Sequence, residues 1–135
     1  FISRGDDSGT HKMEVKLWDL SNFNPEDFGD WYKSVGSGMG ASLNISASIG
    51  AYILSDRASW LNFKNKSDLE ILFSDDKSLL NQYSFIPINP LRHDHVESKL
   101  AEELENWLTS DTAKSLINGY EIGGQALFKF NAQQE

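Results

Sequence analysis

The sequence predicts an α/β fold, in which short apolar strands alternate with helices and a helical segment closes the chain. Two observations carry the prediction. Before Pro90, runs with the two-residue alternation of a strand are separated by runs with helical spacing. After Pro90, apolar residues recur every three or four positions. With 135 residues, 39% of them hydrophobic, the chain can fill one hydrophobic core.

The elements can be assigned in order along the chain. The apolar run at residues 1–3 suits a short strand. From Ser8 onward, a methionine and two leucines spaced four and three residues apart predict a helix. Residues 22–30 contain Pro and Gly and indicate a loop, and residues 31–35 are a possible short strand.

The middle of the chain is harder to assign. Residues 41–55 are ambiguous, because Leu43, Ile45, Ala47 and Ile49 alternate like a strand while the small residues between them suit a tightly packed helix. Three apolar segments are predicted as strands. They are residues 51–55, 69–73 and 83–88.

Two helices are predicted near the C-terminus. Asp94 and Glu97 have the spacing of a capping pair, and an apolar stripe at helical spacing follows them. Residues 110–120 predict the second helix, with Gly119 near its end.

Composition excludes several classes of function. The formal net charge is -8 and no run of Lys or Arg offsets it, which argues against a nucleic-acid partner. A small anion is compatible with this charge, because a local group of donors can be positive inside an acidic protein. The absence of cysteine excludes disulfides and cysteine-ligated metals, and no apolar run is long enough to span a membrane.

The chain begins with Phe-Ile and not with Met, so we expect the C-terminal part of a longer protein.

The polar loop near the start has the chemistry of an anion site. Ser8 suits a helix N-cap, and the backbone N–H groups of Gly9, Thr10 and His11 are among the unpaired donors of the first turn. The helix dipole favours an anion at this end. Arg4 can hold an oxyanion with two parallel hydrogen bonds.

The same loop has a simpler interpretation, in which Ser8 only caps the helix. A capping box would place Glu or Gln at position 11, where the sequence has His11, so the acid that would fill the site is missing. The site stays positive if one of the two neighbouring aspartates pairs with Arg4. A catalytic pair of Ser8 and His11 lacks an identifiable third group that would orient the histidine. The residues alone leave the oxyanion site and the plain cap both open.

Four segments carry a resemblance to a known family. They are SRGDDSGTHK (3–12), WYKSVGSGMG (31–40), AYILSDR (51–57) and NQYSFIPINP (81–90). In order and spacing they resemble the tungstate-binding proteins of bacterial ABC importers, over essentially the whole chain. The resemblance implies the type II periplasmic binding protein fold, with two α/β lobes, a mixed sheet flanked by helices, and a ligand in the cleft. By this resemblance, residues 1–88 form the second lobe, and residues 89–135 form a return segment and C-terminal helices that pack on the first.

The resemblance also implies a ligand set. The related phosphate-binding proteins carry Arg-x-Asp-x-Ser-Gly-Thr, which this sequence matches from position 4 to position 10. The implied ligand residues are Arg4, Ser8, Gly9 and Thr10, with Ser3 as a weaker candidate. Asp6 and His11 would orient these ligand residues without contacting the anion themselves.

The implied function is that of the periplasmic, or extracytoplasmic, substrate-binding component of an importer. It would deliver tungstate or molybdate to a membrane permease, with no catalytic step, no metal site and no cofactor besides the anion. Tungstate and molybdate carry no proton at neutral pH and suit a site of donors, whereas hydrogen phosphate benefits from an acceptor. A phosphate-type binder and the ligand-sensing domain of a regulator stay open as alternatives. Half of the cleft is expected here, with exposed apolar surface that favours self-association.

Three other features are weaker. Residues 36–41 match the Gly-x-Gly-x-x-Ala of a dinucleotide loop, but the preceding strand is short and contains a lysine, so a glycine-rich turn is favoured. His93 and His95 flank Asp94 like part of a metal site, and a solvated loop is favoured there. Residues 56–60 are Asp-Arg-Ala-Ser-Trp and depart from the family's Asp-Arg-Gly-Thr-aromatic run.

Overall fold

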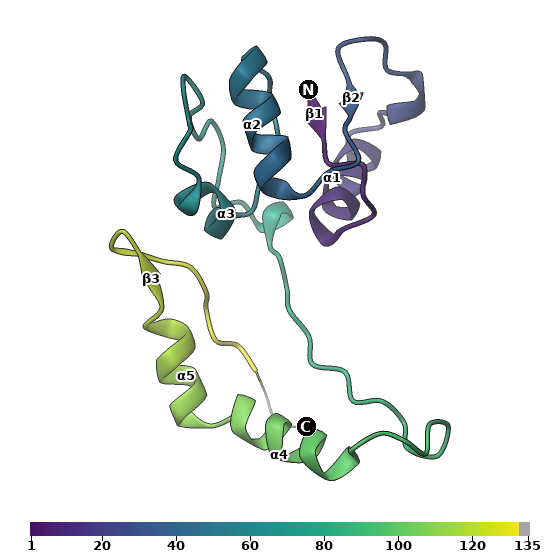
Figure 1. The fold of residues 1–135 in the computed structure, drawn as a ribbon, viewed down its shortest axis with the longest axis vertical. Helices are drawn as coiled ribbons and strands as arrows, with labels where there is room; N and C mark the ends of the chain where they lie inside the picture. Colours follow the sequence, from purple (N-terminus) through teal and green to yellow (C-terminus); the bar gives the residue numbers. More distant parts are fainter. Residues whose placement is uncertain (133–135) are drawn as a thin grey trace. The chain divides into compact units, whose positions relative to one another are not determined.

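The computed structural model describes residues 1–132 and contains two compact units, drawn in Figure 1. The first unit runs from Phe1 to Leu80, and the second begins at Asn81. The expected division into a lobe that ends at residue 88 and a return segment stays a prediction.

The first unit is built on a parallel pair of strands. Its elements are β1 (Ile2–Ser3), α1 (Gly9–Leu20), the 3-10 helix η1 (Pro25–Asp27), β2 (Lys33–Ser34), α2 (Met39–Ile49), α3 (Arg57–Asn62) and the 3-10 helix η2 (Lys77–Leu79). Ile2 lies opposite Lys33, Ser3 lies opposite Ser34, and Ile53 adds a single parallel bridge to Ile2. The alternation of strand and helix is that of an α/β unit, as predicted.

Helix α2 packs on β1 and supplies much of the small core (Figure 1). Met39, Ser42, Leu43 and Ser46 are buried at helical spacing on one face of α2. The ambiguous segment after residue 41 is therefore helical up to Ile49, because its small residues allow a close approach to the strand.

A cluster of aromatic rings fixes the second half of α1. Trp18 lies at its centre, and its ring centroid is 5.1–6.4 Å from those of Phe1, Phe23, Phe28 and Trp31. The predicted loop after α1 folds back through η1 and closes on this cluster. The residues that follow η1 lead into β2.

Three predicted strands do not form as such. Residues 51–55 make only the Ile53 bridge, and residues 69–73 and 83–88 pair with no strand in the part of the chain that the structure describes. A strand requires a hydrogen-bonded neighbour as well as apolar side chains. Without one, the side chains stay exposed, and Ile86 is 80% exposed.

The second unit contains α4 (Ser98–Leu108), α5 (Asp111–Asn118) and a hairpin of β3 (Glu121–Ile122) and β4 (Gln125–Ala126). The predicted second helix is confirmed as α5, with Gly119 as its C-cap. The first helix is capped at Glu97, three residues after the expected cap Asp94, because a hydrogen bond from the Val96 N–H to the His93 carbonyl folds this stretch into a turn. Gly123 and Gly124, both with positive φ, make the tight turn of the hairpin.

Candidate oxyanion-binding site

Arg4 is positioned by the end of β1. The chain turns sharply at Gly5, which has φ 58°, and a Cβ added there would lie 1.8 Å from Ser34 Oγ. Only glycine suits this combination of backbone angle and close approach. The Ser37 N–H donates to the Arg4 carbonyl at 3.1 Å, which ties the loop to the start of α2.

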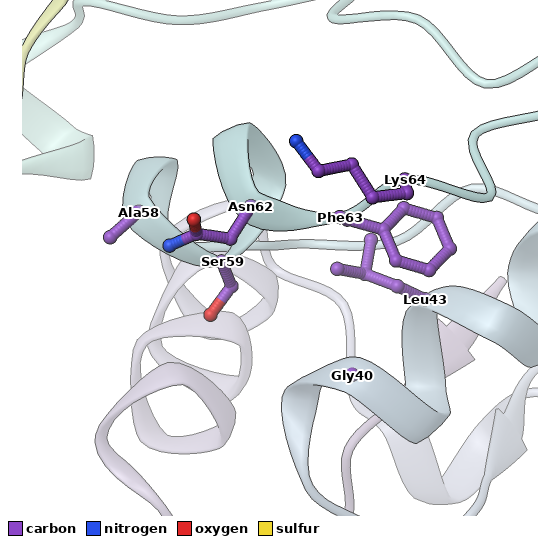
Figure 2. A pocket seen from close by; sticks show the side chains of 7 residues that line it. All are labelled: Gly40, Leu43, Ala58, Ser59, Asn62, Phe63 and Lys64. Atoms are coloured by element: carbon purple, nitrogen blue, oxygen red, sulfur yellow. The ribbon is translucent and has the colours of Figure 1, made fainter. Parts of the chain in front are cut away.

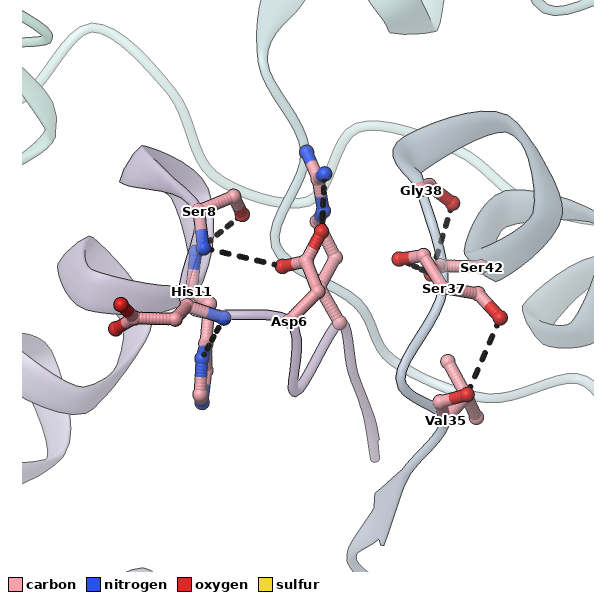
Figure 3. A network of polar contacts seen from close by, with 9 residues as sticks. Asp6, Ser8, His11, Val35, Ser37, Gly38 and Ser42 are labelled. Carbon is pink, nitrogen blue, oxygen red and sulfur yellow. Dashed lines mark hydrogen bonds and ion pairs between the residues drawn. The ribbon is translucent and has the colours of Figure 1, made fainter.

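Asp6, which is labelled in Figure 3, holds the guanidinium of Arg4. Arg4 Nε and Nη2 donate to the same carboxylate oxygen at 3.2 and 2.5 Å, and the other oxygen accepts the Ser8 N–H at 3.3 Å. The hydrogen bond from the Ser8 side chain, followed by the bonds and charge of Arg4, lowers the pKa of Asp6 from 3.8 to about 2. Asp6 is therefore ionised at neutral pH. Arg4 Nη1 has no protein partner among the described residues, so it is available to a ligand.

The second aspartate faces away from this pair. Asp7 Oδ2 lies 3.4 Å from Lys12 Nζ at the surface, and the Asp7 N–H donates to His11 Nδ1 at 3.1 Å. The Ser8 hydroxyl accepts the His11 backbone N–H at 3.3 Å and makes no bond with the imidazole. The arrangement of nucleophile and base that catalysis would need is therefore not assembled.

Helix α1 begins with an open first turn. Ser8 satisfies the N–H of His11, but the N–H groups of Gly9 and Thr10 find no acceptor in residues 1–132. The first turn contains no acidic residue, and a Cβ added at Gly9 would meet nothing within 4 Å beyond the adjoining backbone. The structure thus brings Arg4, held by Asp6, next to two N–H donors that are unpaired within residues 1–132.

Ser3, the weaker candidate, is buried. The residue is 0% exposed, and its hydroxyl forms no hydrogen bond of ordinary geometry. Burial raises the pKa of the nearby Tyr32 above 10.0, although the Ser3 hydroxyl acts to lower it. A contact between Ser3 and the anion stays a prediction.

The start of α2 lies beside the Arg4 backbone and is not among the elements that the sequence predicts for the site. Figure 3 shows Ser37, Gly38 and Ser42 there, with the Ser42 hydroxyl bonded to the carbonyls of the other two at 3.2 and 3.1 Å. Gly38 is the N-cap and supplies no side-chain hydrogen bond. The positive end of a second helix dipole therefore adds to the potential around Arg4. The Gly-Ser-Gly run before the helix is the feature of the sequence that points to this second helix start.

A cavity of about 420 Å³ lies elsewhere in the first unit, between α2 and α3 (Figure 2). Leu43 and Phe63 supply its apolar surface, and Ser59, Asn62 and Lys64 are its polar members. None of the predicted ligand residues lines it. The divergent Ala-Ser at residues 58–59 lines this cavity.

The two histidines near α4 remain a surface feature. The ring centroids of His93 and His95 are 6.0 Å apart, and Asp94 Oδ1 lies 3.9 Å from His95 Nδ1 on exposed side chains. Nowhere in residues 1–132 do three His, Cys, Asp or Glu side chains gather as metal ligands would. The same range contains no helix long and apolar enough to cross a membrane.

The fold and the donor loop define a class of ligand-binding protein. Residues 1–112 match a family model described as the PBP superfamily domain, and the chain belongs to this superfamily. Its α/β unit is that of one lobe of a type II periplasmic binding protein, as the sequence predicts.

Particular relatives are close in sequence and structure. The chain is 43% identical to the tungstate-binding protein TupA of Peptoclostridium acidaminophilum, over 98% of this chain and 46% of that protein. It superimposes on the tungstate-binding protein TupA of Desulfovibrio alaskensis G20 with a TM-score of 0.81 and 39% identity, covering 98% of this chain and 55% of that one. The crystal structure of the tungstate ABC transporter from Geobacter sulfurreducens superimposes with a TM-score of 0.69 and 34% identity, covering 89% of this chain and 50% of that one. The chain spans about half the length of the relatives it matches.

Proposed function

We propose that this chain forms one half of the cleft of an extracytoplasmic, or periplasmic, substrate-binding protein of an ABC importer. Its ligand is a tetrahedral oxyanion, tungstate or molybdate, which it passes to a membrane permease. One observation carries the proposal: Arg4, fixed by ionised Asp6, adjoins the unpaired N–H groups at the start of α1. The names of the relatives support the choice of anion and the link to a transporter.

Each donor has a distinct part in binding. The guanidinium of Arg4 supplies charge and a directed N–H. The backbone of Gly9 and Thr10 supplies two further N–H donors, aligned by the helix dipole. The hydroxyls of Ser8 and Thr10 complete the set on this side of the cleft. No covalent step is needed, so the protein acts as a binding protein with the anion as its ligand and no other cofactor.

The site should discriminate against hydrogen phosphate. Both oxygens of Asp6 are engaged by Arg4 and Ser8, and the carboxylate of Asp7 lies beside Lys12. The loop therefore offers donors and no free carboxylate that would accept the proton of hydrogen phosphate. An anion that is fully deprotonated at neutral pH leaves no hydrogen-bonding group unpaired.

We further propose that residues 1–88 act as one lobe and residues 89–135 as the return segment that packs on the other lobe. An anion held between two lobes contacts both of them only in the closed form. Binding therefore biases a hinge toward closure. The permease would distinguish the closed form from the open one.

Calorimetric titration of the protein as the cell makes it tests this function. Tungstate, molybdate, sulfate and phosphate are added separately at pH 7.5. We expect sub-micromolar Kd values for tungstate or molybdate and a much weaker response to phosphate. Failure of all four anions to bind below the micromolar range would refute the proposal.

A further inference from the structure

One buried charge has no part in the proposed contacts with the anion. Glu14, in the middle of α1, is 4% exposed and is the one charged side chain buried within residues 1–132. Its carboxylate forms no ion pair with any described residue. Burying an unpaired carboxylate is costly unless strong hydrogen bonds compensate for the lost hydration.

Two hydrogen bonds to neutral donors hold this carboxylate. Glu14 Oε1 accepts the Tyr32 hydroxyl at 2.7 Å and the Trp18 indole N–H at 3.2 Å. Burial, with smaller contributions from the hydrogen bond and charge of Glu14, raises the pKa of Tyr32 above 10.0 against an opposing effect of Ser3, so Tyr32 keeps its proton and donates. Hydrogen bonds to an ionised acceptor are short and about twice as strong as neutral ones.

The bond to Tyr32 connects the two elements that carry the anion donors. Glu14 lies about 7.5 Å along α1 from its first residue, Gly9. Tyr32 immediately precedes β2, which pairs with β1 in parallel, and Arg4 follows β1 directly. A path of directed contacts therefore runs from the open first turn of α1, through Glu14 and Tyr32, to the strand that ends at Arg4.

Asp6 also links Arg4 to the Ser8 N–H at the N-cap of α1, but the other contacts between the body of α1 and this strand pair are less directional. The ring of Phe1 lies 5.3 Å from that of Trp18 and stacks on Tyr32 at 5.9 Å. Ring contacts of this kind tolerate small rotations and sliding of a helix. The hydrogen bond between Glu14 and Tyr32 does not tolerate them, because its strength depends on distance and angle.

We propose that Glu14 and Tyr32 are positioning residues, which set the first turn of α1 against Arg4 and so pre-form this half of the anion site. The inference rests on the proposed function. It accounts for a buried carboxylate whose charge alone would oppose an anion on the same helix. Removing the bond should weaken anion binding even though the charge of Glu14 remains.

The test compares variants of the protein as the cell makes it. Tyr32→Phe removes the hydroxyl and keeps the ring and the charge of Glu14. Glu14→Gln keeps an oxygen that accepts from Tyr32 and removes the charge. Tyr52→Phe is the matched control, because the Tyr52 side chain is 68% exposed and its hydroxyl has no partner in the described structure.

Two readouts separate positioning from general stability. The first is the Kd for tungstate, measured well below each variant's melting temperature. The second is the set of backbone N–H resonances of Gly9 and Thr10 in the anion-free protein. We expect Tyr32→Phe to raise the Kd about tenfold, which corresponds to about 1.4 kcal/mol, and to shift both resonances. Glu14→Gln should change the Kd less than Tyr32→Phe does, and Tyr52→Phe should change neither readout.

The outcomes are distinguishable from those for the proposed function. If wild-type protein binds none of the oxyanions, the proposed function fails, while the resonances of Gly9 and Thr10 still report whether Tyr32 positions the turn. If Tyr32→Phe lowers the melting temperature but leaves those resonances and the Kd of wild type unchanged, the pair is only structural and the inference is overturned. Tighter binding by Glu14→Gln together with wild-type behaviour of Tyr32→Phe would show an electrostatic role and would also overturn it.

Discussion

The candidate site depends on the geometry of a single ion pair. Asp6 engages Arg4 through Nε and Nη2, which orients the guanidinium and leaves Nη1 for a ligand. A lysine at this position would bring the same charge but not the planar fork. The turn at Gly5 and the bond from the Ser37 N–H to the Arg4 carbonyl hold the backbone underneath.

Replacing Arg4 should therefore weaken anion binding without unfolding the protein. We expect Arg4→Ala to raise the Kd for tungstate at least about 100-fold, or about 2.8 kcal/mol, because a charged donor is lost. Arg92→Ala is the matched control, since Arg92 is exposed in the second unit. Calorimetry measures the Kd, and thermal melting checks the fold. An unchanged Kd for Arg4→Ala would remove this residue from the site.

The pKa of Asp6 predicts how the loop responds to acid. The folded-state pKa of about 2 lies below the ordinary 3.8, so ionised Asp6 stabilises the fold. This stabilisation is fully present above about pH 3.8 and is lost as the pH falls through 2. Urea unfolding of wild type and Asp6→Asn between pH 7 and pH 2 should show a difference that is constant above pH 4 and shrinks below it. A difference that already disappears between pH 7 and pH 5 would contradict the lowered pKa.

At the scale of elements, the start of α1 has two roles that a single substitution separates. Ser8 caps the helix, and the turn behind it stays open for an anion. Aspartate caps a helix as well as serine does, but it places a negatively charged carboxylate at the N-terminus of the helix.

Ser8→Asp should therefore keep the fold and abolish binding. We expect a melting temperature within about 2 °C of wild type and a loss of tungstate binding through charge repulsion. Ser8→Asn is the uncharged control, because asparagine is an equally good cap. If Ser8→Asp binds tungstate as well as wild type does, Ser8 only caps the helix and the anion lies elsewhere.

The sequence predicts those elements whose signals are local. The start of α1 and the end of α5 follow from Ser8 and Gly119, which act on neighbouring residues. The segment that became α2 is undecided by periodicity, because its small residues suit two structures and packing on β1 makes the choice. Residues 69–73 and 83–88 have apolar composition but find no neighbouring strand among residues 1–132, so composition alone misassigns them.

The same distinction applies to the site. Arg4, Asp6 and Ser8 lie within five positions of one another, and their contacts follow from a local motif. The hydrogen bond of Glu14 depends on Tyr32, which is distant in the sequence. No local pattern indicates such a partner, so the sequence alone does not predict a role for Glu14.

At the scale of the whole molecule, many large apolar side chains are exposed to solvent. In α4, Leu100, Leu104 and Trp107 are 59%, 47% and 46% exposed and lie on one face. Surfaces of this kind promote association when nothing covers them. Residues 1–135 as an isolated polypeptide should therefore self-associate.

Sedimentation velocity over a range of concentrations measures this association. We expect the double variant Leu100→Glu and Leu104→Glu to sediment as a monomer under conditions where wild type forms larger species. Lys99→Glu changes the charge by the same amount on the same helix and should associate like wild type. A wild-type polypeptide that stays monomeric at about 100 µM, where a Kd for association in the micromolar range would give mostly dimer, would show that this face does not drive association.

The central claim is that Arg4 and the first turn of α1 hold an oxyanion. The most direct test is a crystal structure of the protein as the cell makes it with tungstate, in which anomalous scattering locates the tungsten. We predict one strong peak, with anion oxygens within hydrogen-bonding distance of the Arg4 guanidinium and of the N–H groups of Gly9 and Thr10. A fully occupied tungsten peak in the cavity between α2 and α3, with none at Arg4, would contradict the account.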